Sequence, residues 1–215
     1  MVILLSDPRV RAVPVRECGE VLVPLDASFG PARALVRRGL ADRLAEAQDA
    51  LPAGISLLVV EGHRPVAAQR AIIAAYSAEL CAARPGISAD ELAVLTSRFV
   101  APVEVAPHVA GAAVDLTLVD ACGDELDMGT PIDATPEQSD GACYFAAAGI
   151  GADARAHRDL LARVLGAAGL VNYPTEWWHW SFGDRYWALA TGAAAALYGP
   201  AEPGSDTGGD EGVAA

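Results

Sequence analysis

Residues 176–180 read EWWHW, so three tryptophans, a glutamate and a histidine lie within five positions of a chain that has only four tryptophans and four histidines. Tryptophan carries a large apolar ring, and three of them within five residues form an apolar wall. The glutamate and the histidine lie within this wall. An acid–base group beside a metal-ligand type inside an apolar wall indicates a functional site.

The 215-residue length fits one domain with a single core. We expect that domain to span residues 1–199. Residues 200–215 are small, acidic and rich in glycine, and such a segment has too little apolar surface to order itself, so we expect a disordered tail there.

The net charge of −13 arises from 28 acidic residues against 15 basic ones, and every basic residue is arginine. An acidic surface repels phosphate backbones and anionic membranes, which argues against nucleic-acid binding and favours a small or zwitterionic ligand. No apolar run approaches the ~20 residues that span a bilayer, and the N-terminal segment does not resemble a secretory signal. We expect a cytoplasmic protein with reduced, structural cysteines at Cys18, Cys81, Cys122 and Cys143. The oligomeric state is left open.

Hydrophobic periodicity predicts a mixture of helices and strands without regular alternation, which is the α+β class. The expected helices cover residues 31–50, 66–83, 88–99, 153–168 and 184–198. The expected strands cover residues 55–60, 112–119 and the EWWHW segment, and residues 120–151 form a long loop. In the strand at 112–119 the alternation places Asp115 on a polar face.

Three residues supply the ligand types that catalytic zinc prefers. His108, Asp115 and His179 offer two imidazoles and a carboxylate, and a catalytic site leaves a further position open for water. Gly111 allows the chain to bend so that His108 and Asp115 reach one ion. The sequence therefore predicts one zinc ion per chain.

Glu176 and Arg64 are the candidate catalytic residues. Glu176 lies three positions before His179 and is placed to take a proton from the attacking water and pass it to the leaving amine. Residues three apart in an extended strand face opposite sides, so Glu176 and His179 converge only if the chain turns there. Arg64 follows a buried strand and precedes Pro65, where a fixed guanidinium suits a developing oxyanion.

Each of these residues also has an ordinary structural interpretation when taken singly. A lone histidine is often structural or solvated, as we expect for His157 in the helix at 153–168, and a lone arginine is often a surface ion-pair partner. Tryptophan side chains pack in a hydrophobic core more often than they line a cofactor-binding site. The occurrence of all these residues together in a histidine-poor chain favours a functional site over the separate structural interpretations. A metal-binding role for Cys122 and Cys143, which flank the long loop, is a minor alternative.

Three motifs in order, EGHRP at 61–65, APHVAGAAVD at 106–115 and EWWH at 176–179, resemble the zinc D-alanyl-D-alanine dipeptidases of the vancomycin-resistance type, within a wider D,D-peptidase group. MGTPID at 128–133 extends the resemblance. It implies an α+β fold with a small antiparallel sheet, helices around it and zinc at its centre. It also implies zinc on His108, Asp115 and His179, with Glu176 as base and Arg64 as stabiliser of the tetrahedral intermediate.

The same resemblance implies a small dipeptide as substrate, D-Ala-D-Ala or a close analogue, with Asp133 holding its free amino end. The other substrate-binding candidates at the motifs are His63, Ala106 and Trp178. Ala106 replaces a serine of the family pattern, and residues 25–30, LDASFG, shorten another of its segments. Both departures concern substrate recognition, so the preferred substrate is expected to differ while the chemistry is kept.

Two alternatives remain open at this stage. One is a D,D- or L,D-carboxypeptidase or endopeptidase that acts on longer cell-wall peptides, which the absent export signal disfavours. The other is a non-catalytic, hedgehog-like protein that keeps the zinc fold for binding, which the presence of Glu176 and Arg64 disfavours.

Overall fold

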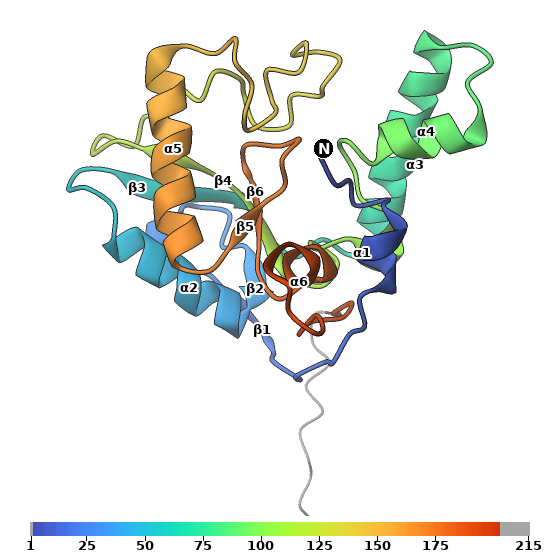
Figure 1. The fold of residues 1–215 in the computed structure, drawn as a ribbon. Coiled ribbons are helices and arrows are strands. Elements are labelled where there is room, and N and C mark those ends of the chain that lie inside the picture. Colours follow the sequence, from blue (N-terminus) through green and yellow to red (C-terminus); the bar gives the residue numbers. More distant parts are fainter. Residues whose placement is uncertain (1, 203–215) are drawn as a thin grey trace, which may run out of the picture.

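A four-stranded antiparallel sheet, in the order β3-β4-β6-β5, lies at the centre of the computed structural model, which describes residues 2–202 (Figure 1). Its strands are β3 (Ser56–Glu61), β4 (Ala113–Val119), β6 (His179–Ser181) and β5 (Val171–Asn172). The sequence predicted the first two within one or two residues. The third begins only at His179, because residues 176–178 of the expected strand belong to a turn region instead. The α+β class is confirmed.

A separate two-stranded sheet pairs β1 (Leu22–Pro24) with β2 (Leu35–Arg37). The helix expected over residues 31–50 was therefore too long at its N-terminal end: the helix there, α2, spans Arg38–Asp49. Leu35 and Val36 satisfy a helical period locally, but their backbone pairs with Pro24 and Val23, which the helical period does not reveal.

Helices surround the central sheet on both sides. They are α1 (Pro8–Ala12), α2, α3 (Val66–Ala83), α4 (Ala89–Thr96), α5 (Ala152–Ala167) and α6 (Arg185–Thr191), with short 3-10 turns η1 (Ala27–Phe29) and η2 (Val103–Val105). In Figure 1, α2 and α5 lie in the left half of the picture, where they overlap the strands, and α3 and α4 lie at the right. The expected bounds of α3 are confirmed, and the Ser88 side chain caps α4 by accepting from the Glu91 N–H.

The last expected helix, residues 184–198, was too long by seven residues. Asp184 caps α6 at its N-terminus, and Gly192, with φ +75°, ends it in the left-handed conformation. Residues beyond Gly192 instead return along the N-terminal segment, where Ala196 pairs with Val15. Ala201, inside the expected tail, still donates its N–H to the Val109 carbonyl. Residues 203–215 of that tail lie outside the described residues.

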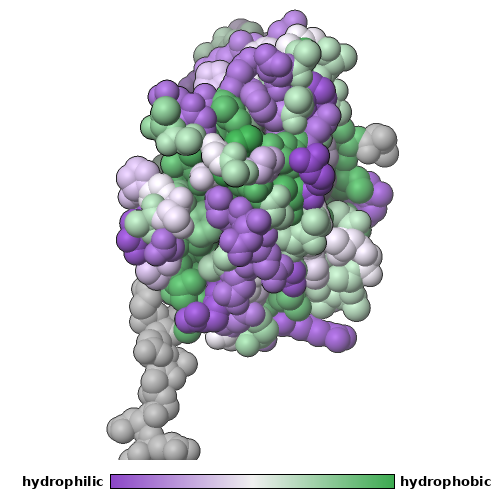
Figure 2. Space-filling view, turned by 90° about the vertical axis from the view of Figure 1, so that its left-hand side faces the viewer, coloured by the Kyte–Doolittle hydropathy of each residue, from purple (hydrophilic) through white to green (hydrophobic). Residues whose placement is uncertain are grey.

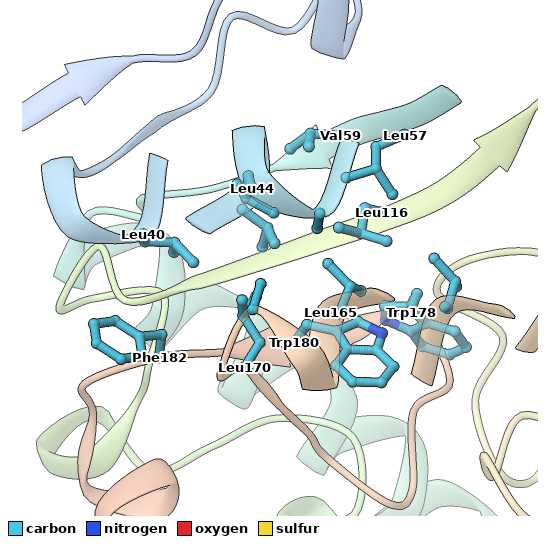
Figure 3. Packing of buried hydrophobic residues seen from close by; sticks show 14 of the residues in the cluster. Leu40, Leu44, Leu57, Val59, Leu116, Leu165, Leu170, Trp178, Trp180 and Phe182 are labelled. Atoms are coloured by element: carbon cyan, nitrogen blue, oxygen red, sulfur yellow. The ribbon is translucent and has the colours of Figure 1, made fainter. Parts of the chain in front are cut away.

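The main core lies between the central sheet and the pair α2 and α5. Val114, Leu116 and Leu118 of β4 are fully buried and face this pair. Figure 3 shows Leu40 and Leu44 of α2 packed with Leu57 and Val59 of β3, Leu116 of β4 and Leu165 of α5. Each fully buried side chain of this size contributes roughly 1.5–3 kcal/mol through removal of apolar surface from water. This packing makes β4 a rigid support for the residues on its other face.

The other face of β4 is buried as well, which differs from the expected polar face. Ala113, Asp115 and Thr117 are at most 3% exposed. The period-2 alternation identified the two faces, but it did not show that segments outside the sheet come close to the second one, as Tyr173 and Ala106 do where they line one pocket with Asp115. Asp115 is therefore a charged group inside the protein, and a buried carboxylate requires compensating partners.

Residues 120–151 form a long connection without helix or strand, as expected, and Arg158 of α5 holds it in place. The side chain of Arg158 is fully buried, although arginine is a charged residue. Its guanidinium donates hydrogen bonds of 2.7–2.9 Å to the carbonyls of Met128, Ala142 and Tyr144. Burial lowers the pKa of Arg158 to about 10, so the group stays protonated at neutral pH.

We expect Arg158→Met to destabilise the fold by roughly 3–5 kcal/mol, because it removes a buried cation and leaves several loop carbonyls without donors. Urea unfolding monitored by tryptophan fluorescence measures this change. Arg163→Met, at an exposed position of the same helix, is the matched control and should change stability by less than about 0.5 kcal/mol. Equal stability of the two variants would show that Arg158 does not anchor the loop.

The face that carries α2 and α5 is covered largely by hydrophilic residues, with smaller apolar areas among them (Figure 2). Within residues 2–202, no helix has both the length and the apolar character to cross a bilayer.

Candidate metal centre

The three expected ligands come from two neighbouring strands and the turn that leads into one of them. Asp115 on β4 and His179 on β6 are register partners, so their side chains project from directly opposite positions toward the same face. His108 lies in the turn before β4. Gly111 closes that turn with φ +64° and donates its N–H to the His108 carbonyl. A side chain is strained at this φ, and a Cβ at Gly111 would also lie 2.3 Å from Leu22 Cδ2, so glycine is favoured at this bend.

The donor atoms of these three residues converge. His179 Nδ1 lies 3.1 Å from His108 Nε2 and 3.1 Å from Asp115 Oδ1, and His108 Nε2 lies 3.4 Å from Asp115 Oδ2. Ligands at about 2.0–2.1 Å from a tetrahedral ion are separated by about 3.3 Å. The three side chains are at most 5% exposed. This arrangement therefore fits a zinc-sized cation.

The histidine hydrogen bonds support the same conclusion. His108 Nδ1 lies 2.7 Å from the Gly62 carbonyl, to which it donates. That bond fixes the tautomer and leaves the lone pair of Nε2 directed at the other donors, as is usual for metal-binding histidines. Within the part of the chain that the structure describes, one group of three or more potential ligands forms such a cluster, and it consists of His108, Asp115 and His179.

Electrostatics tie the cluster together. Burial alone would raise the pKa of Asp115, but the neighbouring His108 and His179 hold that pKa well below its usual value. Burial lowers the pKa of His179, and the charge of His108 lowers it further. Asp115 is therefore ionised and His179 neutral at neutral pH, and these are the forms that bind metal. Burial alone would lower the pKa of the His108 imidazole, but Asp115 outweighs that effect and raises this pKa, so a metal ion has to displace a proton from His108.

Glu176 reaches the cluster because the chain turns. Its N–H donates to the Tyr173 carbonyl at 2.9 Å, and its own carbonyl accepts from Asn172 Nδ2 at 2.8 Å. The turn brings Glu176 Oε2 to 3.7 Å from His179 Nδ1. Burial raises the pKa of Glu176 well above its usual value, and the charge of Asp115 adds to this effect. Glu176 and His179 therefore converge because the chain turns between them, as the sequence analysis required.

Arg64 is held by two side chains that the sequence analysis did not single out. Its Nε donates to Glu61 Oε1 at 2.7 Å, its Nη2 forms a second bond to Glu61, and its Nη1 donates to Gln69 Oε1 at 2.9 Å. Gln69, 1% exposed, is itself fixed by the Ala101 carbonyl. Arg64 has five N–H groups, so two remain free of these bonds.

A pocket of about 270 Å³ opens over the donor atoms, and Arg64, Glu176, Asp133, Ala106 and Trp178 line it. His63 does not: it is half-buried and its Nε2 lies 2.8 Å from the Ala201 carbonyl. Within the EGHRP motif, Arg64 therefore lines the pocket and His63 does not. The expected contact between His63 and the substrate is corrected accordingly.

Asp133 is exposed and adopts a left-handed backbone with φ +63°, unusual for a residue other than glycine. Partial burial and the charges of Asp115 and Glu61 raise the pKa of Asp133.

All four cysteines are free, and none of them belongs to the cluster, so the minor alternative of cysteine ligands at Cys122 and Cys143 finds no support.

Sequence reasoning missed several further residues of the pocket, among them Leu5, Glu61, Gln69 and Tyr173. Glu61 stands inside the EGHRP motif, so its proximity to Arg64 was a usable signal. Nothing local in the sequence connects Leu5 or Tyr173 to this site, because both arrive through long-range contacts.

Comparison with known proteins relates the chain to one group. A family model described as D-ala-D-ala dipeptidase matches residues 27–192. A D-alanyl-D-alanine dipeptidase of Synechocystis sp. is 28% identical over 219 residues, covering 82% of this chain and 87% of that protein. A solved structure of the vancomycin-resistance D,D-pentapeptidase VanY, a mutant in complex with Zn(II), has a TM-score of 0.46 and 17% identity and covers 82% of this chain and 93% of that one.

Proposed function

The chain belongs to the D-ala-D-ala dipeptidase family, a family of zinc metallopeptidases, and from this premise we propose that it hydrolyses D-Ala-D-Ala or a closely related dipeptide with a free amino end. The observation that carries the proposal is the meeting of four side chains from distant parts of the chain. His108, Asp115 and His179 present converging donor atoms, and Glu176 lies beside them in a pocket.

We propose that zinc is held by His108 Nε2, Asp115 and His179 Nδ1. Two imidazoles and a carboxylate are a common set for catalytic zinc, and the separations of 3.1–3.4 Å suit it. When bound, zinc supplies Lewis-acid chemistry by polarising a carbonyl oxygen and acidifying water. The role of the chain itself is to position substrate and to move protons around this point.

Glu176 is the proposed general base and acid. Its carboxylate accepts a proton from the attacking water and donates it to the nitrogen of the departing amino acid. Because burial raises the pKa of this carboxyl, its protonated form is stable enough to act as the acid in the second step. The turn at residues 173–176 keeps it within reach without making it a ligand.

Arg64 is the proposed stabiliser of the tetrahedral intermediate. Glu61 and Gln69 prevent its guanidinium from rotating, so its two remaining N–H groups are already directed before the reaction begins. A preorganised donor of this kind costs no reorganisation when charge develops on the scissile carbonyl oxygen.

Asp133 is the proposed binding site for the amino end. The pocket contains one cationic side chain, Arg64, and the carboxyl groups of Glu61, Asp115, Asp133 and Glu176. An ammonium group is attracted to such a lining and relieves the repulsion that raises the pKa of Asp133. Asp133 forms no hydrogen bond or ion pair within the described part of the chain, so its carboxylate is available to a substrate.

We expect the purified enzyme to cleave D-Ala-D-Ala and to lose at least roughly 100-fold in kcat/KM when the free amino group of the dipeptide is acetylated, because the acetyl group removes the positive charge that pairs with Asp133. Asp133→Asn should lose activity on the free dipeptide and discriminate less between the two substrates. Asp140→Asn is the matched control, since Asp140 lies in the same loop and also has positive φ.

The substrate comparison also separates the alternatives. Equal cleavage of acetylated and free D-Ala-D-Ala would favour a carboxypeptidase that acts on longer cell-wall peptides. A zinc-loaded protein that cleaves neither D-Ala-D-Ala, its acetylated form nor L-Ala-L-Ala would favour a binding role.

A further inference from the structure

The pocket has an apolar side to which the N-terminal segment contributes. Besides the charged groups, its lining includes Leu5, Ile72, Phe99, Val100 and Ala101. Leu5 is 3% exposed and lies well before residues 27–192, where the chain matches its family. Leu5 is therefore a pocket residue that the matched region does not include.

Hydrogen bonds fix Leu5 against the site. Its backbone N–H donates to the Tyr173 hydroxyl at 3.1 Å, and that hydroxyl donates to the Ser97 carbonyl. The Tyr173 ring packs edge-on to the His179 ring, with centroids 6.0 Å apart. The next residue, Ser6, shares a 2.6 Å hydrogen bond with the Ser97 hydroxyl. Leu5 is thus connected through one tyrosine to a proposed zinc ligand.

The orientation of a dipeptide follows from the two sides of the pocket. If Asp133 holds the amino end and the scissile carbonyl lies at the metal, the C-terminal residue points away from Asp133. Its side chain then meets the apolar side. Ala106, which lacks the hydroxyl of the family pattern, adds a further apolar residue to the lining.

We propose that Leu5 is a specificity-determining residue that limits the size of the C-terminal side chain of the substrate. The proposal rests on the proposed function and specifies its substrate class: D,D-dipeptides whose C-terminal side chain is small and apolar. Leu5 closes the pocket with four side-chain carbons, and removing three of them gives room for a larger group.

The experiment compares kcat/KM for D-Ala-D-Ala, D-Ala-D-Leu and D-Ala-D-Phe in the wild type, Leu5→Ala and Leu4→Ala. Leu4 is the matched control because it packs on the same hydrophobic cluster without lining the pocket. Leu5→Ala should raise the ratio of D-Ala-D-Leu to D-Ala-D-Ala by roughly tenfold or more, since fitting a few extra carbons changes transition-state binding by that order. Leu4→Ala should leave the ratio unchanged.

Binding gives a second readout. In a Glu176→Gln background, calorimetry with the same dipeptides should show the same shift in relative affinity on Leu5→Ala. If Leu5→Ala does not fold, Leu5→Val makes a smaller deletion and should shift the ratio in the same direction.

An unchanged ratio in a folded Leu5 variant, or an equal shift in Leu4→Ala, would overturn the proposal while D-Ala-D-Ala cleavage upholds the proposed function. A wild type that cleaves none of the three dipeptides would overturn both.

Discussion

Replacing Glu176 with glutamine is expected to lower kcat by roughly 100- to 10,000-fold while the protein keeps its zinc, because that range is the usual contribution of a positioned general acid–base. The two side chains have nearly the same shape, so packing should survive. Glu176 lies outside the group of three converging donors, and its nearer oxygen is 3.7 Å from His179 Nδ1. The substitution therefore removes proton transfer without removing a ligand.

Metal content by atomic emission and turnover of D-Ala-D-Ala should be measured on the same preparation. Glu79→Gln, at an exposed position of α3, is the control and should match the wild type in both. Full activity in Glu176→Gln would end its assignment as base. Loss of zinc together with activity would show instead that Glu176 maintains the metal centre.

Replacing either histidine of the cluster with alanine is expected to reduce zinc from about one per chain to almost none, and activity should fall with it. Two remaining donors cannot hold the ion as three do, and binding free energy is lost with the missing ligand. Thermal unfolding should respond in parallel: a chelator lowers the Tm of the wild type, which the ion stabilises, but not that of His108→Ala or His179→Ala.

The chain provides its own controls, because its other two histidines lie outside the cluster. His63 contacts the Ala201 carbonyl and His157 contacts the Asp127 carbonyl. His63→Ala and His157→Ala should retain zinc and the chelator-dependent change in Tm. Retention of zinc by both cluster variants, or its loss from both controls, would contradict the proposed ligand set.

The sequence correctly predicted the bounds of those helices and strands that neighbouring residues set. The bounds of α3 follow from Pro65 at its start and an uninterrupted run of helix-forming residues, and the Ser88 cap sets the start of α4. The predicted helices were too long where a distant partner strand or a single glycine decided the boundary. Leu35–Arg37 became a strand because Leu22–Pro24 pairs with it, and Gly192 ended α6 early.

The identity of the candidate ligands and base was present in the sequence, because metal and proton-transfer chemistry require particular residue types and the three motifs supply them in order. Their meeting was decided by tertiary structure. The pairing of Asp115 with His179 sets two donors side by side, and the turn at residues 173–176 brings Glu176 to them. The supports of Arg64 and the Leu5 wall depend on contacts between residues as far apart as Leu5 and Tyr173. Residue type determines which chemistry is available, whereas strand register and chain path determine which side chains share one pocket, and neither is a local property of the sequence.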